Sequence, residues 1–166
     1  MSVSFVPRCL DLPGGRALVI RPMAPADASG LVALYASLTE DDLYRRFFQA
    51  HAPAPKTVDV MVQGAERGGF GLVAVARAAG VSKQRVVAEC GYEVLPNGNG
   101  ELGITVAPGW RGWLGPYLLD ALLDAAAARG VPNLEADILV ENRPMFAMVS
   151  ARGYATVDHY EQPAIV

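Results

Sequence analysis

Hydrophobic and polar residues repeat with two different periods along the chain, and the changes of period divide it into three parts. The first part opens with the apolar run Ala17–Met23, which predicts a strand, and continues with apolar residues at helical spacing. We expect Asp27 to cap a helix that ends near Ser37, Thr39 to cap a second helix over EDDLYRRFFQ, and a third helix to cover Thr57–Glu66.

The middle part has the composition of β-strands. Gly71–Ala78, Val86–Leu95 and Glu101–Ala107 are rich in small and β-branched residues. The sequence PNGNG between the last two contains the Asn and Gly that tight turns require. Residues 70–107 are therefore predicted to form an antiparallel meander of three strands.

The last part returns to helical spacing, with strands between the helices. Pro116–Arg129 carries apolar residues at i, i+3, i+4 and i+7 and is followed by glycine, so it predicts a helix. We expect a strand over Leu134–Val140, a helix over Asn142–Arg152 and a final strand over Tyr154–Tyr160. This order of helices, meander and alternating elements is typical of an α+β fold.

The composition narrows the class of protein. The chain has 166 residues, of which 52% are hydrophobic and 19% are charged, which excludes a disordered chain. Its 14 basic and 17 acidic residues give a net charge of −3, which offers no general attraction for nucleic acid or an anionic membrane. We expect residues 1–16 to be a flexible N-terminal extension, 17–160 a single domain and 161–166 a C-terminal tail. Without a signal-like start or a long apolar run, the protein is expected to be soluble and cytoplasmic.

Residues that bind metals are sparse. Cys9 and Cys90 cannot form a disulfide framework or complete a zinc site, and we interpret them as a surface thiol and a small core residue. His51 and His159 have no second histidine at metal-binding spacing. The sequence therefore predicts no metal site.

The segment Val106–Tyr117 (VAPGWRGWLGPY) leads from a predicted strand directly into the N-terminus of a predicted helix. Such a junction exposes backbone N–H groups and the positive end of the helix dipole, which together attract phosphate. Gly109, Gly112 and Gly115 allow a close approach to the backbone, and Arg111 adds positive charge. A pyrophosphate-containing ligand fits these features; the alternative is that the glycines only shape a turn. The dinucleotide and P-loop fingerprints are absent.

Two groups of residues resemble one known family. The first is I-R-P at 20–22, followed by P-A-D and by L-Y-R-R-F-F at 43–48. The second is the strand–turn–helix over 101–129, the strand over 134–140, Asn142 and R-G-Y at 152–154. Over about residues 17–160 the chain resembles the GNAT superfamily of acyltransferases, in particular bacterial protein-lysine acetyltransferase domains. The resemblance implies a mixed, mainly antiparallel central sheet flanked by helices on both faces.

The resemblance also implies a site for acetyl-CoA or another acyl-CoA. In the family, the strand before the phosphate loop diverges from the next strand, and pantetheine lies in the gap. The main chain of Ile104, Thr105 and Val106 would bind pantetheine, and Asn142 would lie near its end. The pyrophosphate would be wrapped by the loop that consists of Arg111, Gly112, Trp113, Leu114, Gly115, Pro116 and Tyr117.

The chain departs from the family pattern at two places. The family loop reads Q/R-x-x-G-x-G/A, whereas the chain reads R-G-W-L-G-P from Arg111, with Leu114 and Pro116 at the two small-residue positions. The loop is one residue short and carries tryptophan where phosphate needs room, and Pro116 lacks an N–H donor. Val149 stands at the helix position where many members carry a tyrosine as general acid.

Glu101 is the candidate general base, because similar lysine acetyltransferases carry a glutamate at the start of this strand. If the preceding turn is centred on Asn97–Asn99, Leu95 lies opposite Glu101. Opposed residues share a face, and clustered carboxylates can raise one another's pKa. That face would carry Glu89, Glu93, Glu101 and Thr105. A slip of one residue would turn Glu101 to the other face, and the alternative is that these glutamates are simply solvated.

The interpretation that follows is an acyl-CoA-dependent N-acyltransferase. An acetyl group would move from acetyl-CoA to a small amine or a protein lysine by direct attack, and Arg45-Arg46 in the second helix could favour acceptors with acidic groups. No nucleic acid or membrane is expected as a partner, and the apolar tail Pro163–Val166 is compatible with a homodimer. The alternative is a non-catalytic acyl-CoA binding or sensing module on the same fold.

Overall fold

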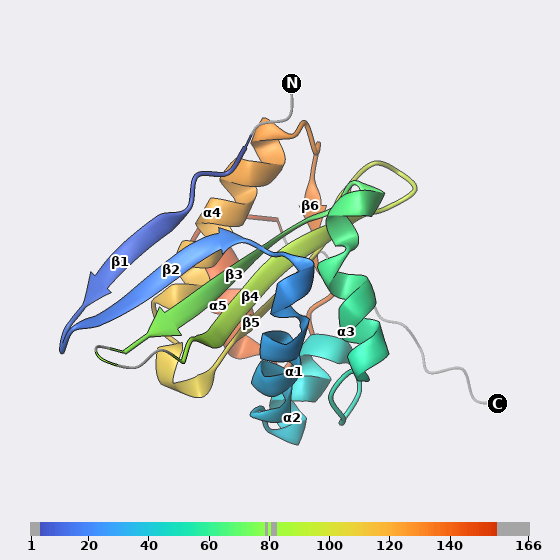
Figure 1. Ribbon diagram of the computed structural model, residues 1–166. Helices are drawn as coiled ribbons and strands as arrows, with labels where there is room; N and C mark the ends of the chain where they lie inside the picture. Colours follow the sequence, from blue (N-terminus) through green and yellow to red (C-terminus); the bar gives the residue numbers. More distant parts are fainter. Residues whose placement is uncertain (1–3, 79, 81–82, 156–166) are drawn as a thin grey trace.

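The structure, a computed structural model, describes residues 4–78, 80 and 83–155. They form a six-stranded sheet whose strands lie in the order of the chain (Figure 1). Neighbouring strands are antiparallel except β5 and β6, which are parallel. The strands are β1 Arg8–Leu12, β2 Arg16–Pro22, β3 Phe70–Arg77, β4 Arg85–Val94, β5 Gly100–Val106 and β6 Leu134–Glu135.

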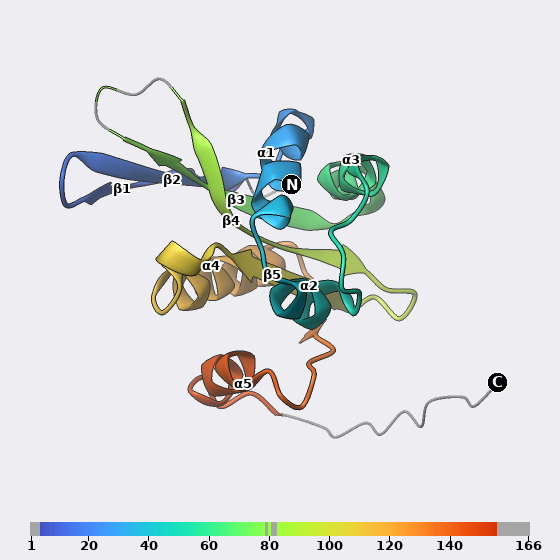
Figure 2. The ribbon, with the colours of Figure 1, turned by 90° about the horizontal axis from the view of Figure 1, so that it is seen from below.

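Helices cover both faces of this sheet. Figure 2 shows α1 and α3 on one side and α4 on the other, and buried aliphatic side chains fill the space between the layers. The α-helices are α1 Ala28–Ala36, α2 Glu40–Phe47, α3 Pro55–Val62, α4 Leu114–Ala128 and α5 Arg143–Ser150. This arrangement confirms the expected α+β fold. Among the described residues, no helix combines the length and apolarity needed to cross a membrane.

The N-terminal segment corrects the expectation of a flexible extension over residues 1–16. Arg8–Leu12 form β1, which pairs antiparallel with β2 along its whole length. The turn between them closes because Gly14 and Gly15 adopt positive φ values of 78° and 69°. Leu10 and Leu12 pack against the core. Their alternation with polar residues before a Pro-Gly-Gly turn is the sequence signal for this strand.

Asp27 does not cap α1 with its side chain, contrary to expectation. Its carboxylate accepts hydrogen bonds from the Arg21 guanidinium at 2.8 and 2.7 Å and from the Ala24 N–H at 2.8 Å. Burial raises the pKa of Asp27, but the hydrogen bonds from Arg21 and Ala24 outweigh this effect and hold it below its usual value. The ion pair between Arg21 and Asp27 ties the end of β2 to the first helical turn. It gives a structural reason for the arginine of I-R-P and the aspartate of P-A-D.

The β4–β5 hairpin has a register that differs by two residues from the expected one. The Leu95 N–H donates to the Asn99 carbonyl at 2.8 Å, and the Gly98 N–H donates to the Leu95 carbonyl at 2.9 Å. Gly98, with φ 86°, closes this turn. Glu93, rather than Leu95, therefore lies opposite Glu101. Because the shift is an even number of residues, Glu101 stays on the expected face.

Elements of the last part also differ from expectation. α4 begins at Leu114, two residues before Pro116. β6 ends at Glu135, where its pairing with β5 stops, so residues 136–140 do not continue the strand. The final strand expected over Tyr154–Tyr160 extends beyond the described residues, and His159 and the tail over 161–166 also lie outside them.

We expect Asp27→Ala to lower the free energy of unfolding by about 2 kcal/mol, because the partly buried Arg21 loses its partner. Urea denaturation at neutral pH measures the change. Asp11→Ala, which removes an exposed carboxylate from β1, is the control and should change stability by less than about 0.5 kcal/mol.

The effect of Asp27→Ala should depend on pH. Since the pKa of Asp27 is lowered in the folded protein, its contribution is complete above the usual carboxyl pKa and is lost as the pH falls through the folded-state value. The two proteins should therefore begin to converge in stability below about pH 4 and become equal only below the lowered folded-state pKa of Asp27. A difference that persists unchanged in acid would mean that packing, and not the ion pair, is responsible.

Candidate active site

Two adjoining cavities lie along β5. The first, of about 280 Å³, is bounded by β3, β4, β5 and the segment from α2 to the turn after α3. The second, of about 250 Å³, lies between β5, the end of α2, residues 136–138 and the start of α5. The residues that line both cavities are Arg46, Phe47, Glu101, Leu102 and Gly103. A ligand that enters through one cavity therefore meets a ligand in the other at this part of β5.

The second cavity follows from the divergence of β5 and β6. At one end, the Gly100 N–H donates to Asn133 on the β6 side, and past the other end the Ala107 N–H donates to Val87 on the β4 side. Because backbone groups alternate in direction along a strand, those of Ile104 and Val106 point to the open edge. The main chain of Thr105 points to β4 instead, which corrects its expected role toward a ligand in the gap.

The start of α4 presents a row of unpaired amides. Within the described chain, no hydrogen bond of 3.5 Å or less with good geometry is found for the N–H groups of Gly112, Trp113, Leu114 and Gly115. The first amide that makes one is Tyr117, which donates to the Trp113 carbonyl at 3.3 Å. Gly112 reaches this conformation with φ 95°. Gly112 and Trp113 are exposed, whereas Leu114 and Gly115 are buried. The exposed amides at the positive end of this 15-residue helix fit a phosphate group, although Pro116 contributes no N–H.

Arg111 is directed toward α2. Its Nε donates to the Val106 carbonyl at 3.1 Å, and its Nη2 lies 2.9 Å from a carboxylate oxygen of Asp42. Burial raises the pKa of Asp42, but hydrogen bonds from Arg111 and Thr39 outweigh it and keep the value below normal. No local sequence pattern indicates this partner, which lies 69 residues away along the chain.

The aromatic residues of the loop lie to its sides. Trp113 is 42% exposed, and its ring centroid is 6.3 Å from that of Trp110. The Tyr117 hydroxyl accepts a hydrogen bond of 3.4 Å from Arg8, whose guanidinium also lies over the Tyr117 ring. Tyr117 thus joins α4 to β1, which lies in the segment that was expected to be a flexible extension.

A buried ion pair links α2 to the sheet. Nε and Nη2 of Arg46 donate to one carboxylate oxygen of Glu89 at 3.3 and 3.2 Å, and Nε also donates to the Thr105 hydroxyl at 3.2 Å. Thr105 in turn donates to the same Glu89 oxygen at 2.6 Å. The guanidinium lies against Gly103, where a Cβ would overlap it. Arg46 is therefore engaged inside the protein, which corrects the expectation that it selects acidic acceptors.

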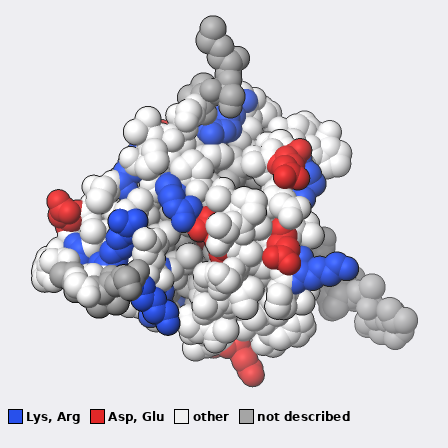
Figure 3. Space-filling model, viewed as in Figure 1, with Lys and Arg blue, Asp and Glu red and all other residues white. Residues whose placement is uncertain are grey.

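The acidic residues expected on one face do share it, but their surroundings differ. Glu89 is 1% exposed and bound to Arg46. Glu93 is exposed and pairs with Arg67 at 3.4 Å. Glu101 is exposed at the junction of the two cavities. On the face seen in Figure 3, acidic and basic side chains lie in small groups separated by uncharged surface.

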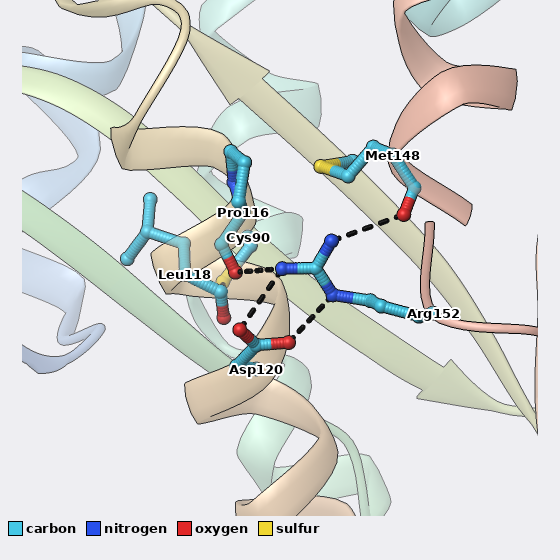
Figure 4. A network of polar contacts seen from close by, with 6 residues as sticks. All are labelled: Cys90, Pro116, Leu118, Asp120, Met148 and Arg152. Carbon is cyan, nitrogen blue, oxygen red and sulfur yellow. Dashed lines mark hydrogen bonds and ion pairs between the residues drawn. The ribbon is translucent and has the colours of Figure 1, made fainter. Parts of the chain in front are cut away.

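Asn142 opens α5 and lines the second cavity. Its side-chain oxygen accepts a hydrogen bond of 3.4 Å from the Met145 N–H. The far end of the helix is fixed to α4 by Arg152, which binds both carboxylate oxygens of Asp120 at 2.6 and 2.9 Å and the Pro116 carbonyl at 3.1 Å (Figure 4). The R-G-Y arginine thus holds α5 beside the amides at the start of α4.

The remaining sequence candidates do not join this site. Cys9 is exposed, and Cys90 is buried against the Leu118 carbonyl, where burial raises the pKa of its thiol. His51 is exposed in a loop. No cluster of three or more metal-binding side chains occurs among the described residues.

The chain resembles known proteins over most of its length. A family model described as "Acetyltransferase (GNAT) domain" matches residues 17–155. The GNAT domain of S. lividans PAT is 24% identical, with a TM-score of 0.74 over 93% of this chain and 91% of that chain. Ribosomal-protein-alanine N-acetyltransferase from Brucella melitensis is 26% identical, with a TM-score of 0.65 over 81% and 82%. The structure of yncA from Salmonella typhimurium with its cofactor acetyl-CoA is 18% identical, with a TM-score of 0.68 over 85% and 81%.

Gly103→Ala should lower the free energy of unfolding by about 2 kcal/mol, because the new methyl group displaces Arg46 and leaves Glu89 buried without its cation. Chemical denaturation measures this. Gly109→Ala is the matched control, since its Cβ would meet no atom within 4 Å, and its effect should stay below about 0.5 kcal/mol. Equal stability of the two variants would show that Arg46 can leave Gly103 without cost.

Proposed function

The chain belongs to the GNAT acetyltransferase family, and from this premise we propose that it is an acyl-CoA-dependent N-acyltransferase that moves an acetyl group to an amine. Acetyl-CoA, or another acyl-CoA, would supply the acyl group as a reactive thioester. The observation that carries the proposal is the meeting of three features: the open edge of β5, the unpaired amides that begin α4, and a carboxylate where two cavities join.

The residues present fit an acyl-CoA. The amides of Gly112–Gly115 and the dipole of α4 would hold the pyrophosphate. The amide-rich pantetheine would lie along the open edge of β5, where the backbone groups of Ile104 and Val106 point. Asn142 lines the same cavity and would lie near the reactive end. An N–H of this edge would also polarise the thioester carbonyl.

The first cavity suits an amine on an apolar stem. Met23, Phe47, Met61, Phe70 and Leu102 supply apolar walls. An amine is a cation at neutral pH and must lose a proton before it can attack a carbonyl carbon. Glu101, on the cavity wall at the junction, would accept this proton directly or through one water. The acceptor is accordingly a small amine or a protein lysine.

Glu101→Gln should lower the rate of acetyl transfer about 100-fold or more, because glutamine cannot accept the proton. Binding of acetyl-CoA, measured by calorimetry, should stay within about threefold, since the thioester and phosphates do not need this charge. Glu93→Gln is the matched variant: Glu93 lies directly opposite on β4 and is also exposed, and its effect on the rate should be much smaller.

The outcomes separate the two functions considered for this fold. An unchanged rate in Glu101→Gln would remove Glu101 from the mechanism. Tight binding of acetyl-CoA without release of thiol, across a panel of amines and lysine peptides, would favour the non-catalytic binding or sensing module instead.

Asp42 and Arg111 should act in opposite directions on the affinity for CoA. Arg111→Ala removes a cation beside the phosphate-binding amides and should weaken binding about tenfold, whereas Asp42→Asn frees Arg111 and should strengthen it about threefold. Asparagine retains an oxygen that can accept from the Thr39 N–H, so α2 keeps its cap. In the double variant the gain from Asp42→Asn should disappear; an equal gain without Arg111 would assign it to another cation.

A further inference from the structure

The proposed transfer places a negative charge at the junction of the cavities. After Glu101 has taken the first proton of the ammonium, the acceptor nitrogen forms a bond to the carbonyl carbon, the carbon–sulfur bond breaks with its electron pair leaving on sulfur, and the second proton of the nitrogen passes to water. The leaving thiolate then takes a proton from water. Val149 of α5 is apolar and cannot donate a proton to the sulfur, so stabilisation of the thiolate must come from elsewhere.

Arg46 is placed at this junction from the α2 side. It lines both cavities, and its guanidinium lies against the main chain at Gly103, two residues along the same face from Glu101. Glu89 and Thr105 hold it in place through Nε and Nη2. In the described chain, no hydrogen bond is found for Nη1, and the Arg46 side chain keeps 21% of its surface exposed, so Nη1 is the donor left for a ligand.

Arg46 differs from the other charged residues around the two cavities in its position and in its fixed orientation. The charged residues that line them are Arg45, Arg46, Glu89, Glu93, Glu101 and Asp137, and Tyr92 in the first cavity is a further titratable residue. Of the two arginines, only Arg46 borders both cavities, while Arg45 borders the second alone. Arg46 is also the one held in a fixed orientation, by a carboxylate that is 1% exposed. A fixed cation in a partly dry cleft stabilises a nearby anion more strongly than a mobile one in water.

Building on the proposed function, we propose that Arg46 is the residue that stabilises the CoA thiolate, with Nη1 directed at the sulfur. Glu89 holds the guanidinium against Gly103 and offsets part of its charge. The ion pair thus sets how strongly the cleft favours a thiolate over a thiol.

The test is the pKa of the thiol of CoA bound to the protein, followed by the ultraviolet absorbance of the thiolate during a pH titration. The same titration with desulfo-CoA, which lacks the sulfur, subtracts the signal from tyrosines. In the unaltered protein the thiol pKa should lie about 1 unit or more below that of free CoA. This readout requires no turnover.

Variants of the ion pair should move this pKa in opposite directions. Arg46→Met together with Glu89→Gln removes both charges without leaving a buried ion, and should raise the thiol pKa toward that of free CoA. Glu89→Gln alone keeps Arg46 and its hydrogen bonds but removes the opposing charge, and should lower the pKa further. Arg46→Lys keeps the cation and should retain most of the shift. A structural role alone would not produce these opposite shifts.

Arg45→Met distinguishes the effect of Arg45 from that of Arg46. It should move the thiol pKa by less than half as much as the double variant Arg46→Met with Glu89→Gln. A larger shift in Arg45→Met, or no difference between Glu89→Gln and the double variant in folded protein, would overturn the inference while the proposed function stands. Failure of CoA to bind the unaltered protein, seen as no rise in Tm, would instead remove the proposed function and this inference with it.

Discussion

The unpaired edge of β5 is the constraint on which the site depends. β6 pairs with β5 only through Gly100–Leu134 and Glu101–Glu135, and among residues 4–78, 80 and 83–155 the rest of that edge has no partner strand. Backbone N–H and C=O groups inside a fold require hydrogen-bond partners. Arg111 satisfies one of them, the Val106 carbonyl. Under the proposed function, a ligand with its own amides would satisfy the others as a strand would, so the divergence of β5 and β6 would create the site.

The sequence predicted the elements of the fold better than their ends. The alternation of apolar and polar residues, the helical spacing and the caps identified the meander and the helices. The face on which Glu101 lies was also predicted, because the expected register of the hairpin was wrong by two residues and an even shift does not change the face. The short β6 was not predictable, because residues 134–140 have strand composition along their whole length, whereas their pairing with β5 stops at Glu135. β1 was missed although its leucines alternate before a glycine turn.

The site was predictable where the backbone defines it and not where distant side chains do. The amides of Gly112–Gly115 follow from a strand–loop–helix junction that can be recognised locally. The pairs Arg46–Glu89 and Arg111–Asp42 join residues 43 and 69 positions apart, and no local pattern specifies such partners. Two of the basic residues expected to meet a ligand therefore have partners inside the protein.

These two pairs have a common support. Asp42 and Arg46 are four residues apart on α2, so they lie on one side of the helix, one turn apart. Asp42 pairs with Arg111 in the loop before α4, and Arg46 lines both cavities. A rigid helix that carries both residues must shift both together. The same short helix therefore joins the loop before α4, through Asp42 and Arg111, to the buried ion pair beside the cavities, through Arg46 and Glu89.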